Sequence, residues 1–298
     1  MAVLIFLSFF LISCSPIQYV DYNESSAVAT RLIASSDTEF IETKDLFSDS
    51  NKHVDKWIQY FSEGSGRQSM QVYLERSGRY EATMKEILKE HDLPEELFYI
   101  AMAESGFQSS VVSSKNAVGY WQFIAATGRS YGLTINSVLD ERQDFVLVTH
   151  AAAKYLKHLY QLYDDWNLAV AAYNAGEGRI NQALQGGFYQ DYWSLVRDDK
   201  IPKETSTFVP KIIAMKKIGT QPWMYGFNNL KYEQPLDYRS IYIYQNFSLK
   251  NLSETLQVPH SQILSLNPKY KQDIAPLNGN DKIKVRIPAH IKIEDINK

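Results

Sequence analysis

Cysteine is almost absent from this sequence, since Cys14 is the only one among 298 residues. A framework of disulfides within the chain is therefore excluded. The six histidines show no metal-ligand spacing, because His150 and His158 lie eight positions apart and no His-Glu-x-x-His pattern occurs. We expect neither a metal site nor an organic cofactor.

The sequence also has no block of basic residues. Lys and Arg number 31 against 34 Asp and Glu, which gives a net charge of -3. This balance argues against nucleic acid as a partner. Aromatic residues are abundant instead, with 20 Tyr, 14 Phe and 5 Trp. Most such side chains belong to cores, but exposed ones form flat amphipathic platforms on which sugar rings can lie.

The apolar run at residues 1–14 is too short to span a bilayer and is typical of a signal-peptide core. Cys14 follows Leu11–Ser13, which resembles a bacterial lipoprotein processing site, although no Lys or Arg precedes the run. The resemblance implies lipidation of Cys14 and anchoring at a membrane surface. The alternative is a buried free thiol. Ser15 gives no inner-membrane retention signal, so we expect a periplasm-facing lipoprotein in the outer membrane of a Gram-negative envelope.

Changes of composition divide the rest of the chain. Residues 15–50 are polar without a sustained period, as in a tether. Residues 51–225 carry amphipathic helical runs, the longest over 144–163, and predict a mainly helical domain. A polar linker over 226–239 leads to residues 240–298, where strand, helix, helix and strand patterns follow one another.

Two shorter helices are predicted late in the helical domain. One covers Trp166–Tyr173 and ends at Gly176. The other covers Phe208–Ile218 and has Pro210 in its first turn, where proline is tolerated.

Residues 93–106 are predicted to form one short helix that carries Glu104 near its end. Asp92 and Glu95 have capping-box spacing, and Gly106 suits the stop. The i, i+3, i+4, i+7 spacing places Glu104 on the apolar, core-facing side. Desolvation and the negative end of the helix dipole should both raise the pKa of this carboxyl group. A protonated carboxyl near neutrality is what a general acid needs. The alternative is a side chain that extends into solvent from a frayed helix end.

Three segments gather residues suited to a polar site. These are Glu104–Phe107 followed by Ser113, Gly119–Phe123, and Ala172–Gly178. Taken singly, each can be explained as a helix end with Gly and Asn at the stop.

Together with Ile201–Thr205 and Phe208–Lys211, these segments resemble in order the motifs of lytic murein transglycosylases related to goose-type lysozyme, in particular the membrane-bound transglycosylase D type. The resemblance spans about residues 52–220. It implies a mainly α, lysozyme-like α+β catalytic domain within residues 51–225. One departure is Phe208, where the family usually has Tyr.

The resemblance implies a single catalytic acid/base, Glu104. It also implies a set of substrate-binding positions along a groove: Ser105, Ser113, Gln122, Tyr173, Asn174 and Glu204. Glu177 is the rival carboxylate, but it follows a helix stop and is expected to be solvated.

The implied substrate is the glycan strand of peptidoglycan. The β-1,4 bond between N-acetylmuramic acid and N-acetylglucosamine would be cleaved without water, leaving a 1,6-anhydromuramoyl end. One carboxylate suffices because the sugar's own C6 hydroxyl is the nucleophile and needs no second carboxylate to activate water. Two alternatives remain: a lysozyme-type hydrolase and a non-catalytic peptidoglycan-binding scaffold.

Residues 240–298 resemble a LysM domain, a β-α-α-β unit that binds glycans containing N-acetylglucosamine. Leu264–Pro268 matches the end of its second helix, whereas Gln245–Leu249 departs from the family after the first strand. Glycan binding by this module is one hypothesis, and a docking or structural module is the other.

Gly128–Gly132 matches the G-x-S-x-G pattern of a nucleophile elbow. That motif requires a preceding strand. Because the helix-like Ala125–Thr127 precedes it, we do not expect hydrolase chemistry at Ser130.

Overall fold

The computed structural model describes residues 19–22, 46–244, 247–275 and 282–292. Among these, residues 46–236 and 267–271 form one compact unit, and the remainder form a second, smaller one. Cys14 and the predicted signal peptide lie outside the described residues. Within the described part of the chain, none of the helices combines the length and apolarity needed to cross a bilayer.

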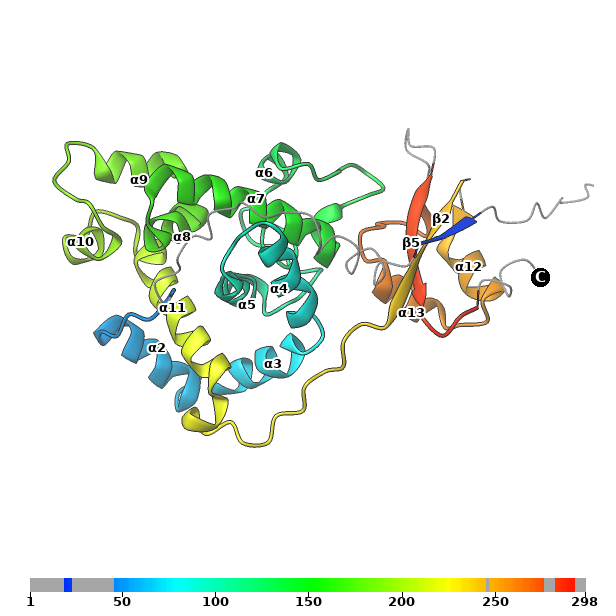
Figure 1. Ribbon diagram of the computed structural model, residues 1–298, viewed down its shortest axis with the longest axis horizontal. Coiled ribbons are helices and arrows are strands. Elements are labelled where there is room, and N and C mark those ends of the chain that lie inside the picture. The colour runs from blue at the N-terminus through cyan, green and yellow to red at the C-terminus, as the bar shows by residue number, and fades with distance from the viewer. Residues whose placement is uncertain (1–18, 23–45, 245–246, 276–281, 293–298) are drawn as a thin grey trace, which may run out of the picture. The chain divides into compact units, whose positions relative to one another are not determined.

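The larger unit is built of helices, shown in order in Figure 1. They are α2 (Lys52–Ser62), α3 (Arg67–Ser77), α4 (Glu81–Glu90), α5 (Phe98–Ser105), α6 (Ala125–Ser130), α7 (Phe145–Tyr163), α8 (Trp166–Ala175), α9 (Glu177–Leu184), α10 (Tyr192–Arg197) and α11 (Lys203–Thr220), with short 3-10 turns at Glu95–Leu97, Glu141–Gln143 and Pro222–Tyr225. Among its described residues, β structure is limited to isolated bridges such as Val112 with Val118.

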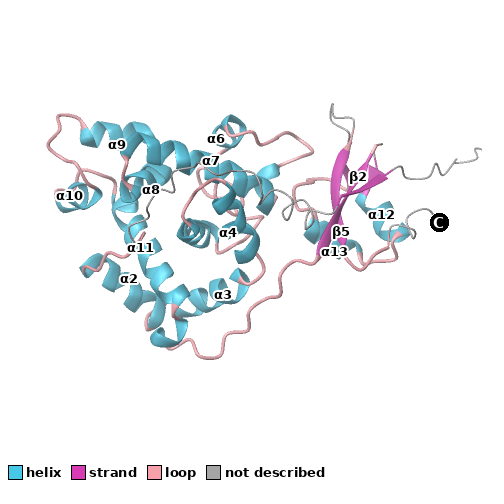
Figure 2. Ribbon diagram, viewed as in Figure 1, coloured by secondary structure: helices cyan, strands magenta, loops and turns pink. Residues whose placement is uncertain are grey.

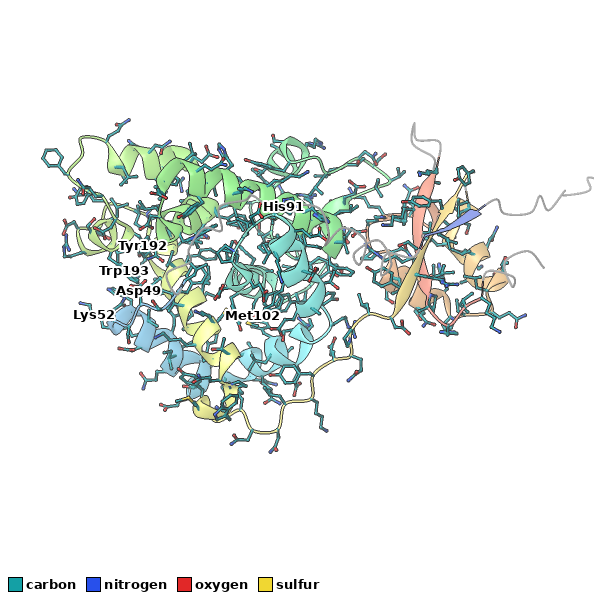
Figure 3. The ribbon with its side chains drawn as sticks, viewed as in Figure 1. Asp49, Lys52, His91, Met102, Tyr192 and Trp193 are labelled. Atoms are coloured by element: carbon teal, nitrogen blue, oxygen red, sulfur yellow. The ribbon has the colours of Figure 1, made fainter. Side chains whose placement is uncertain are left out.

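Helix α5 lies in the core of this unit, packed against α4 and α11. Figure 3 places Met102 of α5 among the surrounding side chains. The residues Phe98–Ala103 and Ser105 are all buried. The sequence predicted a helix with one apolar side, whereas α5 is enclosed on nearly every side. Glu104 is its one partly exposed residue.

The predicted start of this helix is wrong in detail. The chain enters through the 3-10 turn Glu95–Leu97, and Pro94 before it makes no side-chain cap. The capping box of Asp92 and Glu95 does not form, because the N-cap position is Pro94, and the carboxylate of Asp92 pairs instead with Lys157 Nζ at 3.2 Å. An ion pair with another helix has therefore replaced a local cap.

Helices α7 and α8 confirm the predicted helices at 144–163 and 166–173. Asp144 caps α7 by accepting from the backbone N–H groups of Val146 and Leu147, both at 3.2 Å. The prediction for Phe208–Ile218 is wrong about its start, because α11 begins at Lys203 and encloses Pro210. Apolar periodicity missed the polar residues 203–207, which form an additional helical turn.

The smaller unit confirms the predicted strand-helix-helix-strand order. Strand β2 (Tyr238–Ile243) pairs antiparallel with β5 (Ile283–Pro288), and α12 (Leu249–Thr255) and α13 (His260–Leu266) lie between them in sequence. Figure 2 shows these strands in magenta beside the two helices. Ile241 and Ile243 of β2 are fully buried, so the alternating pattern does face a core. A short pair, β3 (Phe247–Ser248) and β4 (Ile274–Ala275), completes the unit.

One strand was not expected. Residues Tyr19–Tyr22, within the segment predicted as a tether, form β1 and pair antiparallel with β2. Strand β2 is thus the central strand of the order β1-β2-β5. A four-residue strand has too short an alternating pattern to be recognised from sequence.

Burial in α7 gives a direct test of the fold. Leu156→Ala removes a side chain that is 0% exposed and should lower the free energy of unfolding by about 2–5 kcal/mol, as cavity-forming substitutions do. Leu162→Ala in the same helix, where the side chain is 50% exposed, should change it by only about 0.5 kcal/mol. Urea unfolding of both variants measures the difference, and equal effects would contradict the placement of α7.

Candidate active site

Glu104 lies in the last turn of α5, where the chain turns sharply away. Gly106 has φ of 56° and its N–H donates to the carbonyl of Met102 at 3.0 Å. A Cβ at this position would lie 2.2 Å from the ring of Tyr73. Glycine is therefore required both for the left-handed conformation and for the close approach of the ring.

Burial and nearby charges set the acidity of Glu104. Desolvation raises the pKa of Glu104 from 4.5 to about 8, Lys211 and Lys115 oppose this rise, and Glu204 adds to it. The sequence-based expectation of a raised pKa is thus confirmed, with desolvation as its main cause. A carboxyl group of this kind is protonated near neutrality and can both donate and accept a proton.

The segment 119–123 is joined directly to the end of α5. The hydroxyl of Ser105 donates to the carbonyl of Tyr120 at 2.9 Å. Gly119 has φ of 81°, and a Cβ there would lie 2.2 Å from the carbonyl oxygen of Arg142. Gln122 donates from Nε2 to the carbonyls of Val111 and Gly119, at 3.1 and 2.9 Å.

A buried arginine holds the same segment from the other side. The guanidinium of Arg142 donates to the carbonyls of Asn116 and Phe123, both at 3.1 Å. It also pairs with Asp140 at 2.7 Å. Both side chains are almost fully buried, 6% and 2% exposed. A buried pair with this many hydrogen bonds fixes the loop rather than binding a ligand.

Helix α8 contributes a tyrosine beside Glu104. The Tyr173 hydroxyl donates to the carbonyl of Trp121 at 2.6 Å, and its ring lies against Tyr155, with centroids 5.4 Å apart. Burial, and then the charge of Glu104, raise the pKa of Tyr173 well above its ordinary value. This tyrosine therefore stays neutral and acts as a hydrogen-bonding group.

Helix α11 contributes the last segment of the candidate site. Thr205 donates from Oγ1 to Asn174 Oδ1 at 2.9 Å, which ties α11 to the end of α8. Glu204, exposed in the first turn of α11, pairs with Lys115 at 3.2 Å. Lys115 belongs to the loop that Ser113 organises, since Ser113 Oγ accepts from the backbone N–H of Ala117 at 3.1 Å.

Hydrogen bonds thus join the predicted segments to one another and to α5, which carries Glu104. Ser105, Gln122 and Asn174 make hydrogen bonds within the protein, so at least part of their role is to hold the site together. Sequence reasoning assigned no role to Arg142, Thr205 or Lys211. The only signal for the first was an oppositely charged residue two positions away, and Lys211 was visible only as the end of the last motif.

The two competing sites do not form. Glu177 opens α9 and pairs with His158 at 3.4 Å, with its side chain 36% exposed. Ser130 lies in α6, which no strand precedes, and its hydroxyl donates to the carbonyl of Ala126. In the described part of the chain, no three His, Cys, Asp or Glu side chains are placed to hold a metal ion.

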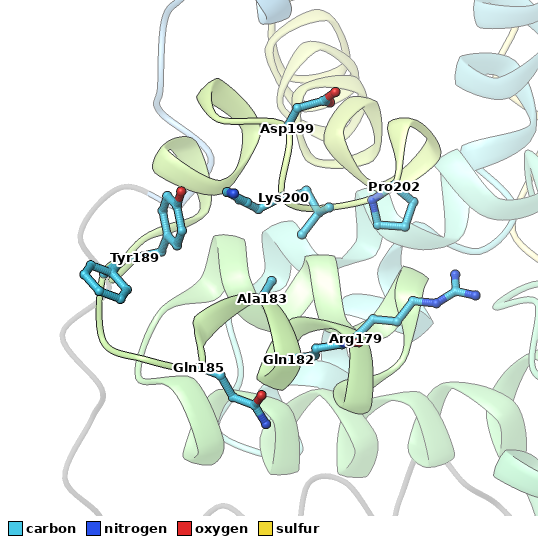
Figure 4. Close-up of a pocket in the computed structure, with 10 residues that line it drawn as sticks. Arg179, Gln182, Ala183, Gln185, Tyr189, Asp199, Lys200 and Pro202 are labelled. Carbon is cyan, nitrogen blue, oxygen red and sulfur yellow. The ribbon is translucent and has the colours of Figure 1, made fainter.

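A cavity of about 780 Å³ lies beside α9, and Glu104 is not among the residues that line it. Figure 4 shows Lys200 and Pro202, from the segment before α11, on one side and Gln182 and Ala183 of α9 on the other. The cavity is open and of mixed polarity, and the candidate active site is a separate feature.

Sequence comparison agrees with this geometry. Residues 81–195 match the family described as the Transglycosylase SLT domain, and this range includes Glu104 and the segments up to α8. The chain contains an SLT domain. Residues 238–296 match the family described as the LysM-like domain of lytic transglycosylase MltD. The SLT domain is mainly helical and the LysM-like domain has the β-α-α-β order, as predicted.

Curated relatives of the SLT domain are known in Escherichia coli. The membrane-bound lytic murein transglycosylase D of strain K12 is 40% identical over 144 residues, which is 47% of this chain and 31% of that protein. The protein of the same name in strain O6:H1 matches equally. The chain thus matches less than a third of the length of either relative. The crystal structure of the 70 kDa soluble lytic transglycosylase of E. coli superposes with a TM-score of 0.43 at 20% identity, covering 63% of this chain and 34% of that one.

The acidity of Glu104 predicts how the stability of the SLT domain depends on pH. Because its pKa rises from 4.5 to about 8 on folding, the folded state binds an extra proton between these values. Its stabilising contribution is complete below pH 4.5 and is lost as the pH rises through about 8. Glu104→Gln cannot titrate, so its free energy of unfolding should fall less over this range than that of the wild type.

Urea unfolding at a series of pH values measures this effect. Glu104→Asp, which keeps a titrating carboxyl group at the same place, is the matched control and should retain a pH dependence of the same sign as that of the wild type. The assignment fails if Glu104→Gln and the wild type show the same pH dependence.

Proposed function

We propose that this chain is a lytic transglycosylase that cleaves the β-1,4 bond between N-acetylmuramic acid and N-acetylglucosamine in peptidoglycan without water. One observation carries the proposal. Glu104, within the residues that match the SLT family, has a pKa raised to about 8, and its carboxyl group interacts electrostatically with Lys115, Tyr173 and Lys211 from other segments.

The proposed reaction uses this carboxyl group twice. Neutral Glu104 donates its proton to the glycosidic oxygen as the bond from that oxygen to C1 of the muramoyl residue breaks. The carboxylate then takes the proton of the C6 hydroxyl as O6 bonds to C1. The acid is regenerated, and the product ends in 1,6-anhydromuramic acid. A pKa near the working pH suits a group that must act first as acid and then as base.

The surroundings of Glu104 support this single-acid scheme. Glu204, the other carboxylate whose charge acts on Glu104, is 66% exposed and paired with Lys115. Its carboxylate is exposed to water, whereas that of Glu104 is desolvated. An intramolecular hydroxyl already has a high effective concentration, so no base is needed to activate water.

The substrate-binding roles belong to the same proposal. Tyr173 and Gln122 lie on segments that meet at Glu104 and have polar atoms suited to sugar hydroxyl and acetamido groups. Ser113, Asn174 and Glu204 are proposed to line the groove that binds the glycan strand. Ser105 is proposed to support this groove through its hydrogen bond to the carbonyl of Tyr120.

The products distinguish the transglycosylase from a hydrolase. Purified protein acting on isolated sacculi should release fragments that carry 1,6-anhydromuramoyl ends, with no heavy oxygen incorporated when the reaction runs in H₂¹⁸O. Mass spectrometry reads both results. Reducing muramic acid ends that contain ¹⁸O would establish the hydrolase instead.

Loss of turnover with retained binding tests the role of Glu104. Glu104→Gln keeps the shape of the side chain but removes its transferable proton, and should lower the rate at least 10²-fold, the usual contribution of general acid–base catalysis. Binding to sacculi should remain. Ordinary activity in this variant would rule out Glu104 as the catalytic acid, and an inactive wild type that still binds would favour the scaffold alternative.

The proposed place of work is the bacterial cell envelope. The predicted lipidation of Cys14 would hold the protein at a membrane surface, and the outer membrane remains the predicted one. The name of the curated relatives, a membrane-bound lytic murein transglycosylase, supports an envelope location.

We also propose that the LysM-like domain binds the glycan strand and holds the enzyme on it. Removal of residues 237–298 should weaken the sedimentation of the protein with insoluble sacculi, because contacts from a second domain raise the local substrate concentration. The catalytic variant Glu104→Gln, with the LysM-like domain intact, is the control and should sediment as the wild type does. Unchanged sedimentation of the truncated protein would leave this domain with a docking or structural role.

A further inference from the structure

Two cationic side chains meet the end of α5, and they come from different helices. Lys211 of α11 donates from Nζ to the carbonyl of Ala103 at 2.6 Å. Arg76 at the end of α3 donates to the carbonyl of Gly106. Terminal carbonyls of a helix need partners, and cations are favoured there by the helix dipole. Both contacts therefore stabilise the turn that carries Glu104.

Of these two cations, Lys211 has the stronger electrostatic effect on Glu104. Lys211 is bonded to the residue immediately before Glu104, and its charge is the largest influence on that carboxyl group after desolvation. Arg76 is bonded two residues beyond it and is not among the charges that shift it. Lys211 thus provides both a hydrogen bond to the backbone just before Glu104 and a positive charge that acts on its carboxyl group.

Lys211 is itself held in the interior. Its side chain is partly buried, and its ammonium group reaches the backbone of α5. Burial lowers the pKa of Lys211, and the nearby Glu104 opposes that change. A buried lysine is costly unless it is paired. Its hydrogen bond to a carbonyl and its proximity to a carboxyl group together offset that cost.

We propose that Lys211 is a positioning residue for Glu104: its ammonium group ties the last turn of α5 to α11 and keeps a positive charge beside the carboxyl group. The proposal rests on the proposed function, in which Glu104 is the acid. It gives α11 an active part in the site through a residue that need not touch the substrate.

The consequence for acidity follows from the groups around Glu104. These are Lys211 and Glu204 on α11, Lys115 on the loop before α6, and Tyr173 on α8. Lys115 is 68% exposed and forms an ion pair with Glu204, so solvent weakens the effect of its charge on Glu104. Lys211 is therefore the main group that limits the rise in the pKa of Glu104. Without it, the acid would hold its proton more tightly and protonate the leaving oxygen less readily.

Three substitutions at Lys211 separate the effect of its charge from that of its hydrogen bond to Ala103. Lys211→Met removes both, Lys211→Gln removes the charge but keeps an N–H donor, and Lys211→Arg keeps the charge. Lys216→Met is the matched control, because Lys216 lies in the same helix and donates to a backbone carbonyl, that of Leu46, at the same distance of 2.6 Å. Its charge is not among those that shift Glu104.

The first measurement is the pKa of Glu104 itself, from a ¹³C NMR titration of glutamate-labelled protein without substrate, with the signal assigned by its absence in Glu104→Gln. Lys211→Met and Lys211→Gln should raise this pKa by about 1–3 units, the usual effect of losing an opposite charge at close range. Lys211→Arg and Lys216→Met should leave it at the wild-type value. An unchanged pKa in folded Lys211→Gln would overturn the proposal, and this variant decides the question if Lys211→Met fails to fold.

The second measurement is the pH profile for release of anhydro products. The alkaline limb should move to higher pH in Lys211→Gln by the amount seen in the titration, and return to its wild-type position in Lys211→Arg. A general loss of rate with an unmoved limb would mean that Lys211 is merely structural. If the wild type releases no anhydro products, the proposed function fails, while the titration still decides the role of Lys211.

Discussion

The cost of burying a carboxyl group at the end of an enclosed helix is the constraint on which the rest of this structure depends. Because α5 is surrounded by other helices, Glu104 loses much of its contact with water, and its pKa rises to about 8. The surrounding segments must then both tolerate and hold this group. Their contacts stabilise the structure in which a partly desolvated acid is held.

Hydrogen bonds connect these segments around Glu104. Ser105 joins α5 to the segment 119–123, Tyr173 joins that segment to α8, and Thr205 joins α8 to α11. Lys211 completes the circle by joining α11 to α5. Several residues of the motifs therefore supply partners for buried backbone carbonyls, where unpaired groups would be costly. Conservative changes in them would disturb the geometry of the site as well as its contacts with substrate.

The charges around Glu104 work in opposite directions and at different depths. Desolvation favours the neutral acid, and Lys211 restrains that preference from a partly buried position. Glu204 and Lys115 lie at the exposed rim and pair with each other, so water and salt weaken their influence. The acidity of the site is therefore governed mainly by how deeply α5 and α11 pack together.

Local sequence determined much of this protein. The caps at Asp144 and Gly176 bound α7 and α8, Gly106 ends α5, and the alternating strands and two short helices of the LysM-like domain are evident from periodicity. The carboxyl group on α5 and its raised pKa could also be predicted, because a glutamate near the end of an apolar helix loses solvent wherever that helix packs. Apart from the size of that rise in pKa, which depends on how the helix packs, these features depend on residues within a few positions of one another.

Tertiary structure alone decided which side chains meet. Lys211 and Ala103 are 108 residues apart, Arg142 and Asn116 are 26 apart, and Asn174 and Thr205 are 31 apart. The period of a helix tells which way a side chain leaves its own axis, but not which group faces it across the core. That depends on how α5, α8 and α11 pack, and packing also turned Asp92 from a predicted cap into a partner of Lys157.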